Sequence, residues 1–513
     1  MAVVSLRLGN SQEFACVRQA LIDSHYTEAT ICERFGLAGL YAFSARQPPV
    51  SEPPRDALDL LIRLFLECAE IPLDMARSLL SGPALTAMEA LDLIEANRDR
   101  EARRTLQSRV ILYPVKSLFL ASDRPPGAGQ DLATDLVYPA ITPNTHRFLF
   151  MLPKRPCESL LELCAGTGVA ALLGSQSATH AWACDINRRA VDFAEFNRRL
   201  NAIENATIAC GDLWSPVEGF TFDRIVAHPP YMPALRQQHI FRDGGEDGEL
   251  ITREIVGKLS TFLKPGGSFY CTTMASDRKT ATLEERVRLM LGPQEQEFDI
   301  VIATHDVFAP FEYYFRLAMA GEDSLDVFRE RARIFQDLGI EQLLTCSLLI
   351  RRHVDTAPAI TVRRQAGPAT SNSEMEWLLN TEVSLQQEAN LPAVLDMRPV
   401  ASPHTRLRTT QAMNAGIWAA TECCFEVDHP FALRAKALPW STVLVAGCAG
   451  VETVREQFRR LQQSGALPPT AAEEDLARFV AALIRGGFLA VPEHEIPASP
   501  ERDYTAAGQV VAS

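Results

Sequence analysis

The sequence predicts an α/β fold in which a mainly parallel sheet is covered by helices. Two observations support this prediction: short apolar segments alternate with helical patterns from Ser159 onward, and polar residues stand where each apolar segment ends. Strands that alternate with helices pair in parallel, and such sheets bind ligands at the carboxyl ends of the strands. In this 513-residue chain we therefore expect the functional side chains to meet at that edge.

The first predicted strand leads into a helix through a glycine turn. The run SLLELCAGTGVAALL starts at Ser159, carries Glu162 inside the strand and turns at Gly166 and Gly168. It fits G-x-G-x-x-A, a pattern that dinucleotide-binding folds also show. Glu162 distinguishes a dinucleotide from a cationic ligand, because a carboxylate beside the turn attracts a cation and repels a pyrophosphate. The turn therefore favours a cationic ligand without phosphate groups.

Three further strands are predicted, and each ends in polar residues. HAWACD ends at Asp185, ATIACGD ends at Asp212, and FDRIVA is followed by HPPY at 228–231. Asp185 can accept both hydroxyl groups of a ribose, and Asp212 can accept a hydrogen bond from the amino group of an adenine. S-adenosylmethionine offers these groups together with a sulfonium cation, so the pattern favours it over a nicotinamide cofactor. Acids that stand at strand ends by chance are the alternative.

These segments resemble the class I S-adenosylmethionine-dependent methyltransferases with an N/D-P-P-Y/F motif, a branch that includes the release-factor glutamine methyltransferases. The stretch from Phe241 to Gly267 is similar to the DGG-x-DG segment, helix and PGG turn of those enzymes. The resemblance covers about Val137 to Arg352, and larger proteins of the "methyltransferase small" type are the most similar. It implies a Rossmann-like, seven-stranded core, methylation of a nitrogen atom, and S-adenosylmethionine as cofactor.

The resemblance also implies a set of cofactor-binding residues. They are Glu162, Cys164, Ala165, Gly166, Gly168, Asp185, Ile186, Asp212, Leu213 and His228. The segment ITPNTHRF takes the place of the family's P-R-x-x-T/S-E stretch and adds Thr142, Asn144 and Thr145. No metal site is expected, because the twelve cysteines include no C-x-x-C pair.

The HPPY motif at 228–231, which follows the fourth predicted strand, is expected to hold the methyl acceptor. Its catalytic residues would be His228, Pro229, Pro230 and Tyr231. In the family, an Asn or Asp side chain and a proline carbonyl hold the hydrogens of a planar nitrogen, and an aromatic ring stacks on it. His228 departs from this pattern, since a neutral imidazole accepts one hydrogen bond or a proton. It favours an acceptor that loses a proton (an amine, guanidine, hydroxyl or carboxyl group), unless it only caps the strand.

Two charged residues after this motif are the candidate substrate-binding residues. Arg242 and Asp243 stand in a loop with three glycines, beside Tyr231 as the third candidate. Such a loop either folds over the site as a lid or is a solvated helix start. The sequence leaves both interpretations open.

Charge and composition limit the class of methyl acceptor and the cellular compartment that we expect. The net charge of −14 and short basic clusters such as Arg98 to Arg104 provide no basic face, so a nucleic acid ranks behind a protein, peptide or small-molecule acceptor. Base methylation and a cofactor-sensing, DNA-binding regulator are the alternatives. Without a long apolar run or an export signal, a cytoplasmic protein is expected. The oligomeric state is left open.

The segments on both sides of the core predict accessory domains. We expect a helical, winged-helix-like domain over 1–105, a strand pair and loop over 106–136, the methyltransferase core over 137–354, a linker over 355–380, a winged-helix-like domain over 381–496 and a disordered tail over 497–513. A module of this kind serves stability, dimerisation or recognition equally well, because a fold does not determine a function.

Overall fold

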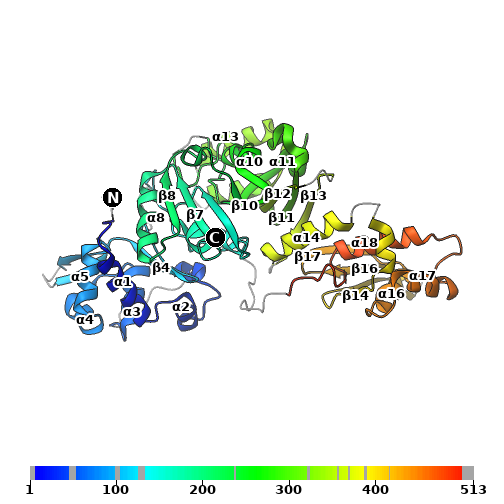
Figure 1. Cartoon of the computed structure of the whole chain (residues 1–513), viewed down its shortest axis with the longest axis horizontal. Coiled ribbons are helices and arrows are strands. Elements are labelled where there is room, and N and C mark those ends of the chain that lie inside the picture. The colour runs from blue at the N-terminus through cyan, green and yellow to red at the C-terminus, as the bar shows by residue number, and fades with distance from the viewer. Residues whose placement is uncertain are drawn as a thin grey trace.

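The computed structural model describes residues 6–45, 53–98, 104–124, 133–235, 238–319, 324–354, 358–367, 370–385, 390–414 and 416–498. A central sheet with its helices forms the middle of the molecule (cyan to green in Figure 1). The N-terminal part lies below one half of this core, and the C-terminal part lies at its other end. Among the described residues, no helix has both the length and the apolar character of a membrane span.

The central sheet has eleven strands in the order β15-β16-β17-β13-β11-β12-β10-β9-β6-β7-β8. Seven neighbouring strands form its core: β6 (Cys157–Leu163), β7 (Ala178–Asp185), β8 (Ala206–Cys210), β9 (Phe222–Ala227), β10 (Leu263–Arg278), β11 (Phe298–Phe308) and β12 (Ile340–Arg352). The first five of these pair in parallel, and β12 runs antiparallel to both β10 and β11. The predicted α/β fold with a seven-stranded, Rossmann-like core is confirmed.

Both faces of the central strands β6, β9 and β10 are buried, which explains why these strands are nearly continuous apolar runs. Successive residues of β6 belong to different hydrophobic clusters, because a strand points alternate side chains to opposite faces: Leu160 to one and Leu161 to the other. One face is covered by α6 (Pro143–Phe150), α7 (Val169–Gly174) and α8 (Arg188–Leu200), and the other by α9 (Leu250–Val256), α10 (Leu259–Phe262), α11 (Leu283–Met290) and the 3-10 turn η3 (Ser215–Val217). A second 3-10 turn, η4 (Gly292–Glu297), connects α11 to β11 and has no buried residue.

The N-terminal part shares one hydrophobic cluster with the α8 face of the sheet. Its elements are α1 (Ser11–Asp23), α2 (Glu28–Phe35), η1 (Leu40–Ala45), α3 (Ala57–Leu61), the π-helical turn η2 (Ile62–Leu66), β1 (Ile71–Pro72), α4 (Leu73–Leu79), α5 (Gly82–Ala90), β2 (Ile94–Arg98), β3 (Arg104–Ser108), β4 (Ile111–Val115) and β5 (Leu118–Ser122). Strands β1, β3 and β2 form a small sheet, and β4 pairs with β5. A winged-helix-like arrangement stays a prediction.

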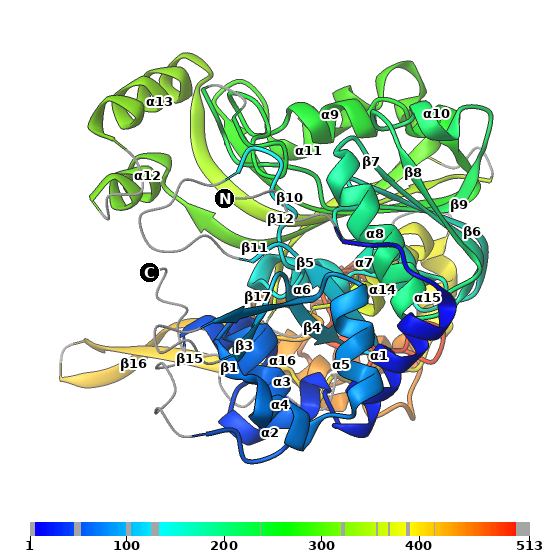
Figure 2. The same ribbon diagram turned by 90° about the vertical axis from the view of Figure 1, so that its left-hand side faces the viewer.

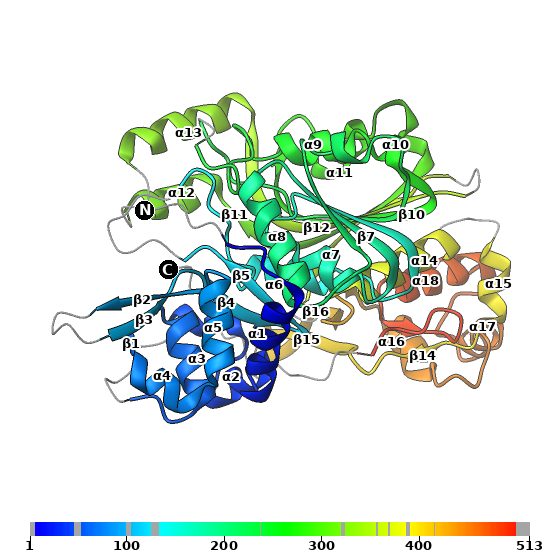
Figure 3. The same ribbon diagram turned by 60° about the vertical axis from the view of Figure 1, so that its left-hand side comes forward.

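Helix α8 joins the N-terminal part to the core. Phe14 of α1 meets Phe196 edge-on, with ring centroids 5.0 Å apart. The fully buried Asn197 accepts a hydrogen bond from the Ala121 amide at 2.7 Å and donates to the carbonyls of Ala121 and Thr167. Figure 3 shows α1 and α5 just below α8. The strand pair β4–β5 is therefore bonded to the core by side chains of α8.

The structure differs from the expected linker over 355–380. Residues Thr361–Ala366 form β13, which pairs in parallel with β11, and α14 spans Asn372–Leu385. Polar residues that are typical of a linker, Asn372, Ser373 and Glu374, form the start of this helix. Glu374 accepts hydrogen bonds from the backbone and hydroxyl of Ser371 (2.7 and 2.5 Å), and Met375 is fully buried in the next turn.

The remaining C-terminal elements are α15 (Leu391–Asp396), β14 (Val400–Ala401), β15 (Arg406–Asn414), β16 (Ile417–Val427), β17 (Phe431–Lys436), α16 (Pro439–Gly447), α17 (Val454–Gln463), α18 (Glu473–Arg485) and β18 (Leu489–Ala490). Strand β17 pairs with β13, so this part continues the central sheet. The hairpin β15–β16 and the helices α12 (Pro310–Met319) and α13 (Leu325–Asp337) project on the same side in Figure 2. The winged-helix-like interpretation stays a prediction. Of the expected disordered tail, residues 499–513 lie outside the described residues.

Candidate active site

A cavity of about 1110 Å³ opens at the carboxyl ends of β6, β7, β8 and β9. This is the edge at which parallel α/β sheets bind ligands. The sequence-predicted residues that line it are Thr142, Asn144, Thr145, Glu162, Cys164, Ala165, Gly166, Asp185, Ile186, Asp212, Leu213, His228, Pro229, Pro230, Tyr231, Arg242 and Asp243. The one predicted residue outside this lining is Gly168. What each residue binds stays a prediction.

The glycine turn after β6 uses its two glycines for different purposes. Gly166 and Gly168 have φ angles of +54° and +77°, a region that side chains other than glycine rarely adopt. A Cβ on Gly166 would meet no atom within 4 Å, whereas a Cβ on Gly168 would lie 3.1 Å from the Cβ of Ala194 on α8. Gly166 therefore leaves open space at the cavity, and Gly168 allows α7 to pack against α8.

Glu162 links β6 to the first turn of α7. Its carboxylate accepts hydrogen bonds from the amides of Ala170 at 3.2 Å and Ala171 at 2.7 Å. Burial raises the pKa of this carboxyl to about 8, against the opposing effect of the two backbone donors. The acid therefore has a fixed orientation beside the glycine turn. Near neutral pH it keeps its proton, and a cation next to it would favour proton loss.

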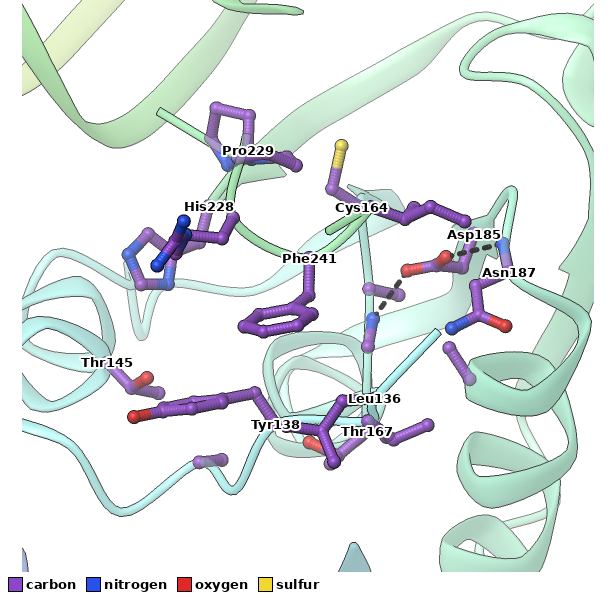
Figure 4. Close-up of a pocket in the computed structure, with 18 of the residues that line it drawn as sticks. Leu136, Tyr138, Thr145, Cys164, Thr167, Asp185, Asn187, His228, Pro229 and Phe241 are labelled. Carbon is purple, nitrogen blue, oxygen red and sulfur yellow. Dashed lines mark hydrogen bonds between the residues drawn. The ribbon is translucent and has the colours of Figure 1, made fainter. Parts of the chain in front are cut away.

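Asp185 connects the glycine turn after β6 to the loop after β7. Its carboxylate accepts hydrogen bonds from the amides of Gly166 and Asn187, both at 2.8 Å (Figure 4). Burial raises the pKa of Asp185, and these two donors oppose the shift. The side chain of Asn187 donates to the Asp135 carbonyl at 2.9 Å and so joins the segment before α6 to this loop. Sequence patterns gave no signal for Asn187.

His228 lies in a stack of aromatic rings at the opposite end of the cavity. Its ring centroid is 5.2 Å from that of Phe148 and 5.6 Å from that of Tyr231. Burial lowers the pKa of His228 to about 4. Its Nε2 atom is buried and has no hydrogen-bond partner among the described residues. Near neutral pH the imidazole is therefore uncharged and can bond to a ligand.

Asn144 points toward the acceptor motif. Its amide nitrogen donates to the Tyr231 hydroxyl at 2.6 Å. The start of α6 is capped by Thr142, whose hydroxyl accepts from the Thr145 amide at 3.2 Å. Arg147, one turn farther along α6, bonds to Asp306 of β11 at 2.6 Å. Thr142 and Thr145 therefore cap the start of α6, and Asn144 orients Tyr231.

The charged loop after the HPPY motif is held together by hydrogen bonds among its own residues. The buried carboxylate of Asp243 accepts hydrogen bonds from the amides of Gln238 and His239, both at 2.8 Å, and from Nε of Arg242 at 3.2 Å. Glu249, also buried, accepts from the Ser276 amide at 2.9 Å. Asp243 therefore shapes the loop, and of these two charged residues only Arg242 keeps a half-exposed side chain.

Two aromatic residues of the cavity were missed by the sequence reasoning. The rings of Tyr138 and Phe241 stack with centroids 5.5 Å apart and planes 12° from parallel, and Figure 4 shows both beside the pocket. The loop that carries Phe241 bonds to Thr134 through the Ile240 amide at 3.1 Å. Only the folded chain brings these two loops together, so no local pattern could have identified the pair.

Comparisons with known proteins find matches for part of this chain. Residues 140–301 match the family model described as methyltransferase small domain. The chain is 31% identical over 127 residues to the release factor glutamine methyltransferase of Moorella thermoacetica, and 30% identical over 127 residues to the ribosomal protein uL3 glutamine methyltransferase of Bradyrhizobium diazoefficiens. These matches cover 22% of this chain and 45% and 40% of the two relatives.

Among solved structures, the YcgJ protein of Bacillus subtilis is similar over 41% of this chain and 99% of its own, with 13% identity and a TM-score of 0.29. The chain spans less than half the length of the two curated relatives. Residues 140–301, which match the family model, contain the glycine turn, the acidic strand ends and the Pro-Pro-Tyr motif. Residues 140–301 are therefore similar to the methyltransferase small domain, and part of the chain is similar to the glutamine methyltransferases.

Proposed function

We propose that this protein is an S-adenosylmethionine-dependent methyltransferase that methylates the amide nitrogen of a glutamine side chain in a protein or peptide. The observation that carries this proposal is the uncharged His228 beside Pro229 and Tyr231 at the end of the cavity. The names of the two relatives support glutamine as the acceptor.

The cavity fits the proposed cofactor. When bound, S-adenosylmethionine supplies a methyl group activated by a sulfonium cation. Gly166 leaves open space at the turn, and Glu162 provides an acid beside it that can become an anion. Asp185 and Asp212 line the same cavity as acceptors for hydroxyl and amino groups.

The properties of His228 revise the acceptor class that the sequence favoured. A general base works best when its pKa lies near the operating pH. With a pKa of about 4, His228 is a weak base and a good neutral hydrogen-bond acceptor. An amide nitrogen needs its hydrogens held while its lone pair turns to the methyl group, and His228 and the Pro229 carbonyl can supply the two acceptors. The methylated nitrogen then loses one of these protons to water, because an N-protonated amide is a strong acid. Tyr231, oriented by Asn144, supplies the ring against which a planar amide stacks.

The alternatives of base methylation and DNA binding lack support among the described residues. Two adjacent arginine pairs, Arg351–Arg352 and Arg363–Arg364, are bound to acids: Arg351 to Glu376, Arg352 to Glu297, Arg363 to Asp277 and Arg364 to Glu382. Neutralised side chains of this kind do not form the basic face that phosphate binding requires.

Labelled cofactor tests the proposal directly. The protein is incubated with methyl-labelled S-adenosylmethionine and, in parallel, a bacterial release factor, ribosomal protein uL3 and a cell extract. Mass spectrometry of the labelled products should locate the methyl group on a glutamine side chain, with wild-type protein active and Gly166→Val inactive as the control. Label on an amine, a hydroxyl group or a nucleobase would contradict the proposed acceptor, and no label in any mixture would contradict the activity.

A further inference from the structure

The cavity includes a residue of the N-terminal part. Tyr41 of η1 lines it together with Thr142, Pro143 and Asn144 at the start of α6. The ring centroid of Tyr41 lies 5.0 Å from that of His146 on α6, with the planes tilted by 51°. Asn144, in the same turn of α6 as His146, is the residue that bonds to Tyr231. Tyr41 therefore contacts α6, the helix that also holds Asn144, and lines the same cavity as the acceptor motif.

The position of the Tyr41 ring depends on Gly39. A Cβ on Gly39 would lie 2.4 and 2.8 Å from two carbons of this ring, closer than nonbonded carbon atoms approach. The ring therefore lies directly on the backbone of Gly39, and any larger residue there would displace it.

The contact between the N-terminal part and α6 is braced by Lys116. Its amide donates to the Glu28 carboxylate of α2 at 3.2 Å, and its ammonium group donates to the Leu149 carbonyl of α6 at 3.2 Å. Burial and the charge of Lys116 lower the pKa of His146 to about 4, so His146 is uncharged near neutral pH. The wall formed by Tyr41 and the start of α6 is therefore fixed in place and carries no ionised side chain.

We propose that Tyr41 is a specificity-determining residue: it contacts the uncharged residues that flank the methylated side chain of a peptide or protein acceptor. A phenol suits this role, because its ring packs on apolar groups and its hydroxyl bonds to a peptide group. A free small molecule that reaches only His228 and Tyr231 would not need this wall. The inference rests on the proposed function, and it gives the N-terminal part a role in acceptor recognition.

Two bisubstrate probes and S-adenosylhomocysteine separate the contribution of the acceptor motif to binding affinity from that of Tyr41. The first probe is an adenosine compound with a propionamide arm, which imitates a glutamine side chain. In the second, the same arm belongs to the glutamine of an Ala-Gln-Ala tripeptide. Calorimetry on the full-length chain gives the dissociation constants. The first probe should bind more tightly than S-adenosylhomocysteine through the acceptor motif, and the second should bind more tightly again through Tyr41.

Substitutions assign the second gain to Tyr41. Tyr41→Ala should weaken the tripeptide probe by roughly fivefold to thirtyfold, as truncation of a central interface aromatic does, and leave the first probe and S-adenosylhomocysteine within about twofold. Tyr41→Phe should retain most of the gain. Gly39→Ala should reproduce the loss by displacing the ring. Ile22→Ala, on the half-exposed surface of α1, is the control and should change no constant.

The outcomes distinguish the inference from the function on which it rests. If the propionamide arm adds nothing to the affinity of wild-type protein, the proposed amide acceptor is wrong. If that arm adds affinity but the tripeptide adds no more, or if Tyr41→Ala retains the full gain, Tyr41 has no part in recognition. Weaker binding of all three ligands by Tyr41→Ala, with unchanged thermal stability, would also overturn the inference, because Tyr41 would then shape the cofactor end.

Discussion

At the scale of single residues, His228 distinguishes this chain from the motif that it otherwise resembles. Its pKa of about 4 makes it a hydrogen-bond acceptor at neutral pH. His228→Ala should therefore lower kcat roughly tenfold to a hundredfold, the effect of one lost hydrogen bond, while the cofactor affinity stays within a few-fold. His228→Asn should recover most of this loss, because an amide oxygen also accepts a hydrogen bond.

The pH profile provides the control for His228. Because its imidazole stays neutral above about pH 5, kcat of the wild type should show no inflection from this group between pH 6 and 9. An inflection near pH 7 that disappears in His228→Asn would contradict the hydrogen-bond role and indicate a general base.

Glu162 gives a second prediction at this scale. Its carboxyl has a pKa of about 8, so at pH 7 it is mostly protonated. A bound sulfonium favours the carboxylate, which lowers this pKa and releases up to about one proton for each cofactor molecule bound. Calorimetry in buffers of different ionisation enthalpy should detect the release for S-adenosylmethionine and much less for S-adenosylhomocysteine, which lacks the sulfonium charge. Glu162→Gln should remove the difference; equal release in that variant would assign the proton to another group.

At the scale of elements, α8 determines how the N-terminal part is attached. Asn197 satisfies the amide and carbonyl of Ala121 and the carbonyl of Thr167 from a fully buried position. Asn197→Ala would leave these groups without partners, at a cost of about 1–3 kcal/mol for each buried group. We expect a loss of at least 3 kcal/mol in the free energy of unfolding, measured by urea denaturation. Asn205→Ala, which changes a part-buried residue just before β8, should lower the free energy of unfolding by less. An equal decrease in the two variants would contradict a special role for Asn197.

At the scale of the whole molecule, α14 belongs to the core rather than to a linker. Met375, Leu378 and Leu379 are fully buried in the cluster that includes the N-terminal part, and Glu376 bonds to Tyr270 and Arg351. A chain that ends at Leu385 should therefore be more stable than one that ends at Thr370, by on the order of 5 kcal/mol from the burial of three apolar side chains. Denaturation of the two truncated chains measures the difference. Equal stability would mean that α14 contributes nothing to the core.

The local pattern was sufficient for the central strands and for the cavity that they form. Apolar runs that end at Asp185, Asp212 and His228 predict parallel strands, and all three residues line one cavity. This succeeds because the carboxyl ends of parallel strands meet at one edge of a sheet. The pattern failed at Ser371 to Glu374, where polar residues begin a helix whose side chains are buried from Glu374 onward.

The sequence by itself determined the α/β core, the glycine turn and the composition of the acceptor motif, because each depends on neighbours along the chain. Only the tertiary structure decided the protonation of Glu162 and His228, since burial shifts a pKa and burial depends on the complete fold. It also decided that Tyr41 lines the cavity, because residues far apart in the chain meet only when the N-terminal part packs against α6.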